Sequence, residues 1–520
     1  MIRTRRTERG AASSPGTGPG VAGTFALIAG LAVAFPLAAQ EPAAPERVPG
    51  LALPVVEDTL PNGMRVLALR RPGAPTASFV LRFDVGSENE GPGQTGIAHL
   101  LEHLLFKGTT TIGTTGVEQE RPLFAVMDAA QDSLLMGEAV PLGEPAESRL
   151  RDRIDALEDS ARGYVVPNEF DRILTESGAR SMNATTGYEA TTYYVRLPSN
   201  RAELWFVLEA DRMVNPVFRE FYAERAVVAE ERRTRVDANP GGRLLEEFYA
   251  AAFRVHPYGT PVIGHMADIL THTRAEVAEY HRRYYRPGNA VVAVVGDIDP
   301  ARIQGWARRY FGPIPAGDDP APVTVEEPPQ RGERRIRVPF EAEPEVIIGW
   351  HVPPGDHPDA PALEVMARIL AGGRTGRLYQ RLIRDGGLAT SVSASVGPGY
   401  RGPRLFTVSA QPLAGTGTDE LESAIYDELE RLVAEPPTAV ELARVRNQIE
   451  ASDVHRLASN LGLAFQLAES VAYHGDWRET FRAGGRLARV TAADVRRVAR
   501  EYLTADNRTV AVLVAPEESP

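Results

Sequence analysis

The sequence predicts an α+β fold that is built twice, because two stretches of the chain repeat one pattern. Residues 273–295, TRAEVAEYHRRYYRPGNAVVAVV, align with residues 491–513 at a constant offset of 218 and without gaps. Each copy combines an amphipathic helix, a turn at an asparagine and a strand rich in valine. In the first half, residues 64–69 and 77–85 have the pattern of strands that precede helices. We therefore expect two related α+β domains, each with a sheet covered by helices on one side.

The expected domain boundaries follow from the length of the chain and from one seam. A chain of 520 residues is long enough for two or more domains. Residues 312–335 are rich in proline and charge, which is typical of a linker. We therefore place a first domain at 54–312, a linker at 313–335 and a second domain at 336–520.

Residues 111–178 contain a predicted insertion in the first domain. Leu150, Ile154 and Leu157 recur at helical spacing among charged residues, and residues 122–137 have a helical pattern as well. The segment is expected to form a helical hairpin that projects from the domain. It is either a surface insertion that the fold tolerates or a functional lid.

The first 39 residues are typical of an export signal. A start rich in arginine precedes an apolar run at 21–37, and Leu-Ala-Ala at 37–39 offers a cleavage site of small residues. We expect a signal peptide at 1–39, a linker at 40–53, and an exported, periplasmic protein with no membrane span after cleavage. The alternative is an uncleaved anchor, for which the apolar run is marginal.

The composition excludes several other classes of protein. The net charge of −12 argues against a nucleic-acid partner. The absence of cysteine rules out both a lipoprotein anchor and disulfides. With 43% hydrophobic and 24% charged residues the chain is globular, so its function must be sought in a site.

One short string carries most of the chemistry, since residues 99–103 read His-Leu-Leu-Glu-His. On a helix, His99, Glu102 and His103 share one face, between a predicted N-cap at Thr95 and a predicted stop at Gly108. Two imidazoles one turn apart can bind a zinc ion, and a carboxylate beside them can activate a water molecule. The order H-x-x-E-H is the inverted zincin signature. The alternative is a pair of structural histidines in a core.

A catalytic zinc ion needs a third protein ligand, and a chain without cysteine must supply it from His, Asp or Glu. Residues 224–231, ERAVVAEE, place Glu224 and Glu231 on one helical face together with two valines. An unpaired charge among valines would be costly, and a metal ion is one way to satisfy it. The alternative is a solvated acidic face.

The strings HLLEHLLFKG and ERAVVAEE together resemble the zinc peptidases of the pitrilysin, insulysin and mitochondrial processing peptidase family. Between them, Asn183, Thr186 and Tyr193 match the family's N-A-x-T…T-x-Y segment. A further match is His-Pro-Tyr-Gly at 256–259. The resemblance covers most of residues 55–515.

The resemblance implies a fold, a metal and a set of roles. The fold is a two-layer α/β roll used twice and closed like a clam shell around a chamber. One zinc ion (Zn²⁺) per chain is expected on His99, His103 and Glu231, with Glu224 supporting these ligands. Glu102 is the implied catalytic base of a metalloendopeptidase that hydrolyses peptides or unfolded polypeptide segments. The matched residues Asn183, Thr186 and Tyr193 are implied to bind the peptide substrate, with its backbone added to a sheet edge.

The second half departs from the family pattern at one point. The family often supplies there an arginine and a tyrosine, seven residues apart, that touch the substrate. The aligned positions hold Ile383 and Thr390, with Arg384 one residue from the first. We therefore expect a dimer in which a second, related subunit supplies the missing pair. The competing expectation is a register shift that brings Arg384 into place.

Two other functions compete with peptide hydrolysis. One is a structural subunit of this fold that has lost catalysis, and the other is an exported peptide-binding protein with a metal but little turnover. Survival of the motif residues in the chain favours the enzyme. Peptide cleavage measured with and without a chelator separates the enzyme from both.

Overall fold

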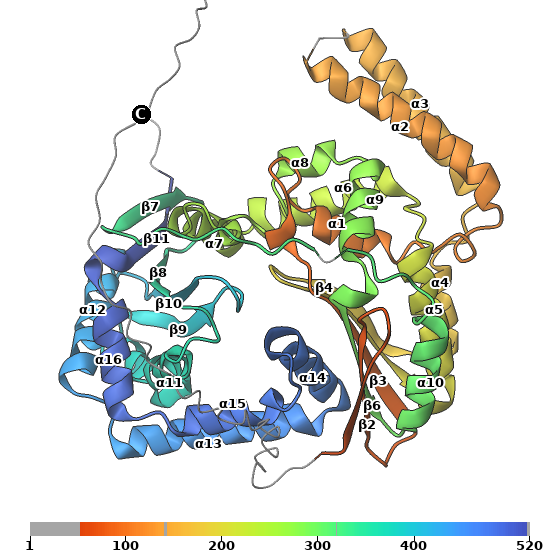
Figure 1. Cartoon of the computed structure of the whole chain (residues 1–520). Helices are drawn as coiled ribbons and strands as arrows, with labels where there is room; N and C mark the ends of the chain where they lie inside the picture. Colours follow the sequence, from red (N-terminus) through yellow and green to blue (C-terminus); the bar gives the residue numbers. More distant parts are fainter. Residues whose placement is uncertain (1–52, 140–142, 319, 517–520) are drawn as a thin grey trace, which may run out of the picture. The chain divides into compact units, whose positions relative to one another are not determined.

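The computed structural model describes residues 53–139, 143–318 and 320–516, and the predicted signal peptide lies outside them. The described chain holds two mixed sheets, each with its own helices, as the repeat predicts (Figure 1). The family's duplicated α+β fold is therefore confirmed. Within 311–333, the described residues form no helix or strand, and this is where the sequence places the linker.

The first sheet has six strands in the order β1-β2-β6-β3-β5-β4. Strands β2 and β6 pair in parallel, and the other neighbours are antiparallel. The edge strand β4 of this first sheet contacts helix α1. Its strands are β1 (Val55–Thr59), β2 (Arg65–Arg70), β3 (Thr76–Phe83), β4 (Arg180–Thr186), β5 (Thr191–Pro198) and β6 (Ala290–Gly296). The helices in this half of the chain are α1 (Ile97–Leu104), α2 (Val117–Ala139), α3 (Glu144–Arg162), α4 (Glu169–Glu176), α5 (Ala202–Val214), α6 (Phe221–Arg232), α7 (Pro240–Ala252), α8 (Met266–Thr271), α9 (Arg274–Tyr284) and α10 (Pro300–Tyr310).

The second sheet has five strands in the order β7-β11-β8-β10-β9, and β11 pairs with β7 in parallel as β6 does with β2. Strand β9 is an edge, like β4 in the first sheet. Its strands are β7 (Arg334–Pro339), β8 (Glu345–Val352), β9 (Ala389–Gly397), β10 (Arg404–Pro412) and β11 (Arg508–Val514). The helices in this half of the chain are α11 (Ala360–Ala371), α12 (Thr418–Ala434), α13 (Ala439–Ala458), α14 (Asn460–His474), α15 (Glu479–Ala488) and α16 (Ala492–Tyr502).

The repeat that is visible in the sequence recurs in the hydrogen bonds. Helices α9 and α16 both begin with a capping box, formed by Thr273 and by Thr491. After each helix, the side-chain amide of Asn289 or Asn507 donates to two backbone carbonyls, one of them on the helix's last residue. The asparagine therefore fixes the turn between helix and strand in both halves.

The two halves exchange one helix each. Helix α14 packs its buried Leu463, Leu467 and Val471 on the face of the first sheet that the first half's helices leave free. Helix α7 packs Leu244 and Phe248 on the second sheet in the same manner. Each half thus covers one face of its sheet with its own helices, as expected, and the other face with a helix from the other half. The sequence pattern of either half alone does not predict this helix from the other half.

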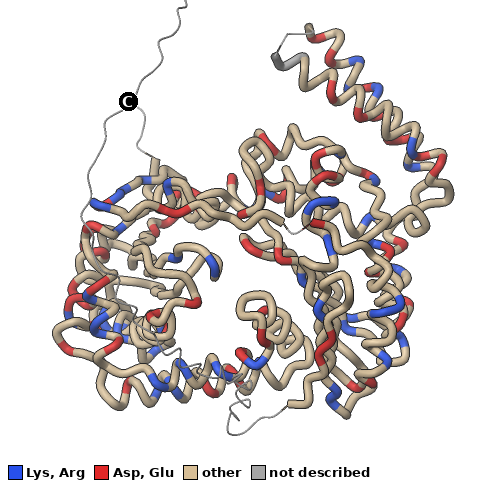
Figure 2. The backbone as a smooth tube through the Cα atoms, viewed as in Figure 1, with Lys and Arg blue, Asp and Glu red and all other residues tan. Residues whose placement is uncertain are grey.

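The predicted helical hairpin is confirmed as the pair α2 and α3, which projects from the first half (Figure 1). Charged residues of both signs lie along it (Figure 2). Its base is buried, because Phe124, Met127 and Ile154 belong to the core of the first half. The remaining part of the predicted insertion includes α4, whose Phe170 and Leu174 are core residues. The projecting part is therefore shorter than 111–178.

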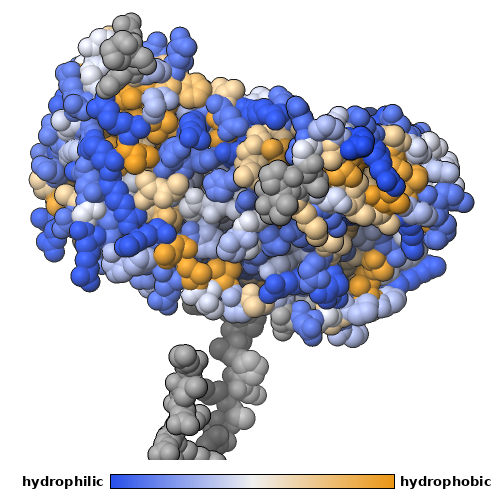
Figure 3. All heavy atoms as spheres, turned by 90° about the horizontal axis from the view of Figure 1, so that it is seen from above, coloured by the Kyte–Doolittle hydropathy of each residue, from blue (hydrophilic) through white to orange (hydrophobic). Residues whose placement is uncertain are grey.

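Among the described residues, no helix combines the length and the apolar character needed to cross a bilayer. On the face shown in Figure 3, hydrophobic side chains form small separate patches among hydrophilic ones. Scattered patches of this kind are normal for a globular protein.

Candidate metal centre

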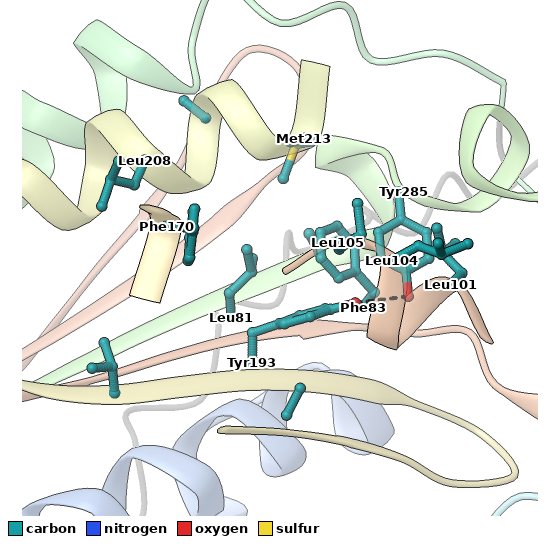
Figure 4. Close-up of a cluster of buried hydrophobic side chains, with 14 of the residues drawn as sticks. Leu81, Phe83, Leu101, Leu104, Leu105, Phe170, Tyr193, Leu208, Met213 and Tyr285 are labelled. Atoms are coloured by element: carbon teal, nitrogen blue, oxygen red, sulfur yellow. Dashed lines mark hydrogen bonds between the residues drawn. The ribbon is translucent and has the colours of Figure 1, made fainter. Parts of the chain in front are cut away.

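Helix α1 presents its two histidines because its opposite face is buried. Leu101 and Leu104 are fully buried and, with Leu105, point into the core beside Phe83 and Tyr285 (Figure 4). His99 and His103, one turn apart on the other face, are only half-buried, and their rings meet edge to face with centroids 4.8 Å apart. The amphipathic pattern of α1 therefore turns both imidazoles toward α6.

The start and end of α1 differ from the prediction. The N-cap is Gly96, not Thr95, and it has a positive φ of 87°. The carboxylate of Glu90 accepts hydrogen bonds from the backbone N–H groups of Gly96 and Ala98, both at 2.9 Å, and so replaces a cap from the neighbouring side chain. The helix ends at Leu104, four residues before the predicted stop at Gly108.

A glycine is required at position 96 for a second reason. A Cβ there would lie 2.4 Å from the backbone oxygen of Ile263 and 3.0 Å from the Cα of Gly264. Gly264, whose φ is 86°, is blocked in the same way by Thr95 and Gly96. The two glycines let the segment before α8 lie directly against the start of α1.

Three side chains from α1 and α6 converge as a possible metal site. His99, His103 and Glu231 each offer one ligand atom, and these atoms lie within 4.8 Å of one another. The Nε2 atom of His99 is 3.8 Å from Glu231 Oε1, and that of His103 is 3.4 Å from Glu231 Oε2. Two imidazoles and one carboxylate, with a position left for water, are a common donor set for catalytic zinc.

The second nitrogen of His103 is engaged by Glu224. Its Nδ1 atom lies 3.4 Å from Glu224 Oε2, and the other oxygen of Glu224 lies 2.6 Å from the Nζ atom of Lys107. Burial raises the pKa of Glu224, but the hydrogen bonds of His103 and Lys107 outweigh it and keep that pKa below its usual value. An ionised Glu224 orients the ring of His103 and leaves Nε2 free for a metal.

The state of His99 also fits a metal ligand. Burial, together with the nearby charges of His103 and Arg235, lowers the pKa of His99 to about 3. The imidazole is therefore neutral at physiological pH and offers a lone pair. Its Nδ1 atom is buried and has no hydrogen-bond partner among the described residues. The donor types, their separation and the neutral imidazole of His99 all fit a zinc ion.

Glu231 is paired with a cation that sequence reasoning missed. Arg235 NH1 lies 2.6 Å from Glu231 Oε1, although the arginine side chain is 72% exposed. The spacing i, i+4 on a helix could have revealed this pair. The pairing occupies the carboxylate that a metal ion would use, so zinc and Arg235 compete for Glu231.

Glu102 lies on the same helix and is held from the edge strand. The hydroxyl of Thr186, the last residue of β4, donates a hydrogen bond to Glu102 Oε2. Burial raises the pKa of Glu102, and the hydrogen bond from Thr186 opposes that shift. A buried carboxyl with a raised pKa has the character of a general base or acid.

The other two predicted substrate-binding residues lie in different environments. Asn183 is exposed on β4, where its side chain accepts a hydrogen bond from the N–H of Ala184. Tyr193 is only 2% exposed, and its hydroxyl is 3.4 Å from that of Tyr285 in the core (Figure 4). The guanidinium of Arg212 lies 4.1 Å from the centre of its ring. Tyr193 therefore lies behind the site, and we assign it no contact with substrate.

At the two positions that depart from the family pattern, 383 and 390, no side chain in this structure replaces the missing arginine and tyrosine. Ile383 packs against the core of the second half. Arg384 is 57% exposed and forms an ion pair with Asp385 at 2.7 Å. Thr390 lies near the start of β9 and donates to the backbone oxygen of Gln411 at 3.3 Å.

Comparison with known families matches both halves. The family model described as insulinase, peptidase family M16, matches residues 65–122 and 161–265. The one described as the peptidase M16 inactive domain matches residues 271–449. The chain belongs to the peptidase M16 family, the family that its motifs resemble. Residues 123–160, most of the hairpin, lie outside these matches.

Individual relatives that are named as proteases match most of the length of this chain. The zinc protease PqqE of Helicobacter pylori is 27% identical over 470 residues, which is 88% of this chain and 92% of that protein. An uncharacterized zinc protease of Mycobacterium leprae is 28% identical over 89% of this chain and 92% of its own length. The crystal structure of a protease from Helicobacter pylori covers 89% of this chain and all of its own, with a TM-score of 0.75 and 26% identity.

Proposed function

We propose that this protein is a zinc-dependent endopeptidase. The observation that carries the proposal is the convergence of His99, His103 and Glu231, with Glu102 on the same helix as the two histidines. Membership of the M16 family and relatives named as zinc proteases support it. When bound, zinc would polarise the substrate carbonyl and make a water molecule more acidic.

The chain's own residues then have separate roles. Glu102 accepts a proton from the attacking water and passes it to the departing amine nitrogen. Thr186 holds the carboxylate of Glu102 in place by its hydrogen bond. Glu224 orients His103 through Nδ1. The proton therefore moves from water to amine through one side chain, Glu102, which is part of α1 and is held by Thr186 of β4.

The edge strand β4 is the proposed docking line for substrate. It ends at Thr186, and β5 pairs with only one of its sides. An extended peptide can add to such an edge through backbone hydrogen bonds, with its scissile bond near Glu102. Asn183, exposed on the same strand, is in position to bond a peptide backbone.

The proposal is tested with two variants and one control. Glu102→Gln is expected to retain stoichiometric zinc but to lose peptide cleavage by about a hundredfold or more, because a base is removed and no ligand is. Glu231→Gln is expected to lose zinc. Glu230→Gln is the matched control, since Glu230 is adjacent and its partner is Arg233 on the surface.

Metal content and the rate of cleavage of an unfolded peptide are measured for each variant. Cleavage by Glu102→Gln at the rate of the unchanged protein would contradict the proposed base. Zinc bound equally well by Glu231→Gln would contradict the proposed ligand set.

We also propose that full activity requires a related second subunit. The support is the absence of an arginine and a tyrosine at positions 383 and 390. In this arrangement Arg384 is bound to Asp385. The alternative, a non-catalytic or peptide-binding subunit of the same fold, predicts zinc binding without turnover both alone and with a partner.

A further inference from the structure

The hairpin, most of which lies outside the family match, contacts the start of the helix that carries Glu224 and Glu231. Arg219, two residues before α6, has a side chain without solvent exposure, and so has its partner Glu120 on α2. The Nε atom of Arg219 lies 2.9 Å from Oε1 and 3.0 Å from Oε2 of Glu120. A fully buried pair depends on both members, because either alone would be an uncompensated charge.

The remaining donors of Arg219 reach the segment that follows α1. They bond the backbone oxygens of Thr109 at 2.6 Å, Ile112 at 3.1 Å and Lys107 at 3.3 Å. One guanidinium thus joins three elements: the exit of the helix with both histidines, the start of the helix with Glu231, and the base of the hairpin.

Two further contacts join the hairpin to the first turn of α6 and to the start of α9. Asp128 on α2 accepts a hydrogen bond from Tyr222 at 2.7 Å and one from Arg274 at 3.2 Å. Helix α6 has no side-chain cap of its own, since its N-cap is Glu220 in the left-handed region. The hairpin therefore contacts the first turn of α6, where no side chain caps the helix.

We infer that the hairpin is a brace for the metal centre, and that Arg219 with Glu120 is a positioning pair that sets the separation of α1 and α6. This inference rests on the proposed function, because the readout is zinc affinity. Zinc ligation tolerates errors of only about 0.2 Å in ligand distance. A loosened α6 moves Glu231 relative to the two histidines and weakens the site without touching a ligand.

The test compares zinc affinities, measured by competition with a chelator. Glu120→Gln and Asp128→Asn are expected to weaken zinc binding about tenfold or more, a size known for groups that support metal ligands. Glu441→Gln is the control, because Glu441 forms an ion pair with Arg377 in the second half, far along the chain from the metal ligands. Its zinc affinity is expected to equal that of the unchanged protein, although an ion pair is lost.

A second measurement uses the metal-free protein. Hydrogen exchange of the α6 amides is expected to rise in Glu120→Gln and Asp128→Asn and to stay unchanged in the control. Replacing residues 137–149, which join the two helices in the sequence, by a short glycine-serine turn is expected to leave both readouts unchanged, because Glu120 and Asp128 are kept. If Glu120→Gln fails to fold, Asp128→Asn decides, since Asp128 is one-third exposed.

The outcomes separate this inference from the proposed function. Unchanged zinc affinity in both base variants, with zinc bound by the unchanged protein, would overturn the brace alone. An equal loss of affinity in the Glu441→Gln control would also overturn it, because the effect would then follow general stability. A protein that binds no zinc in any form would overturn the proposed function and the brace with it.

Discussion

The hydroxyl of Thr186 donates a hydrogen bond to the carboxylate of Glu102, and this contact joins the end of an edge strand to the helix of the H-x-x-E-H motif. The two residues are far apart in the sequence. Their contact places the proposed line of substrate binding next to the proposed base. It also favours the ionised form of Glu102 against the effect of burial.

Two replacements of Thr186 distinguish the effect of its hydrogen bond to Glu102 from any effect on folding. Thr186→Val keeps the shape of the side chain and removes the donor, so we expect kcat/KM for peptide cleavage to fall about tenfold, the cost of a hydrogen bond to a charged group. Thr186→Ser keeps the hydroxyl and should stay near the unchanged activity. Zinc content should be full in both, and an active Thr186→Val would contradict a role for this contact.

Glu224 is expected to act through His103. Glu224→Gln removes the charge beside Nδ1, so zinc should bind ten- to a hundredfold more weakly, about the range for partners of metal-ligating histidines. Glu220→Gln is the control, because Glu220 contacts Lys107 at 3.4 Å but not His103. Zinc affinity is measured by chelator competition, and equal values in the two variants would argue against this role.

The exchanged helix α14 should stabilise the first half although it belongs to the second. Leu467 is fully buried against the first sheet. Leu467→Ala should therefore lower the free energy of unfolding by about 2–5 kcal/mol, because it leaves a cavity. Val454→Ala, at an exposed position on α13, should change it little. Hydrogen exchange of β2 and β6 should rise only in Leu467→Ala; protection that is lost solely in the second half would contradict the exchange.

The stability that Glu441 contributes should depend on pH. A hydrogen bond from Arg377, with others from Thr438 at the start of α13, lowers the pKa of Glu441 to about 2 against an ordinary value of 4.5. A carboxyl with a lowered folded pKa stabilises the protein above the unfolded value and loses that contribution as pH falls from 4.5 toward 2. The difference in unfolding free energy between the unchanged protein and Glu441→Gln should be of order 1 kcal/mol at neutral pH, after solvent screening. Denaturant titrations at several pH values check it, and a difference that grows on acidification would refute the assignment.

Arg384 tests whether the chain works alone. Because its guanidinium pairs with Asp385 on the surface, we expect slow cleavage by the isolated protein and no further change in Arg384→Ala. Addition of a related subunit that carries the missing arginine and tyrosine should restore cleavage. Fast cleavage by the isolated chain that collapses in Arg384→Ala would show instead that Arg384 shifts into place and no partner is needed.

The local sequence pattern was sufficient to predict the helix that carries the two histidines and the division into two related halves. The motif at 99–103 predicts a helix with two histidines on one face, and the structure has that helix, because its leucines fix which face is buried. The repeat at an offset of 218 predicts two related halves, and the same threonines cap α9 and α16. The predicted cap at Thr95 was wrong, because a more distant carboxylate, Glu90, satisfies the same N–H groups.

The sequence by itself indicated the family, the duplicated α+β fold, the helical hairpin and the residues that could hold zinc, since each of these rests on short motifs that can be recognised one at a time. Tertiary structure alone decided that α7 and α14 cover the sheet of the opposite half, that Thr186 holds Glu102, and that Arg219 joins α1, α6 and the hairpin. These contacts link positions far apart along the chain. A buried charge or a leucine in a helix looks the same in the sequence whichever distant partner it meets, so only the packed fold identifies that partner.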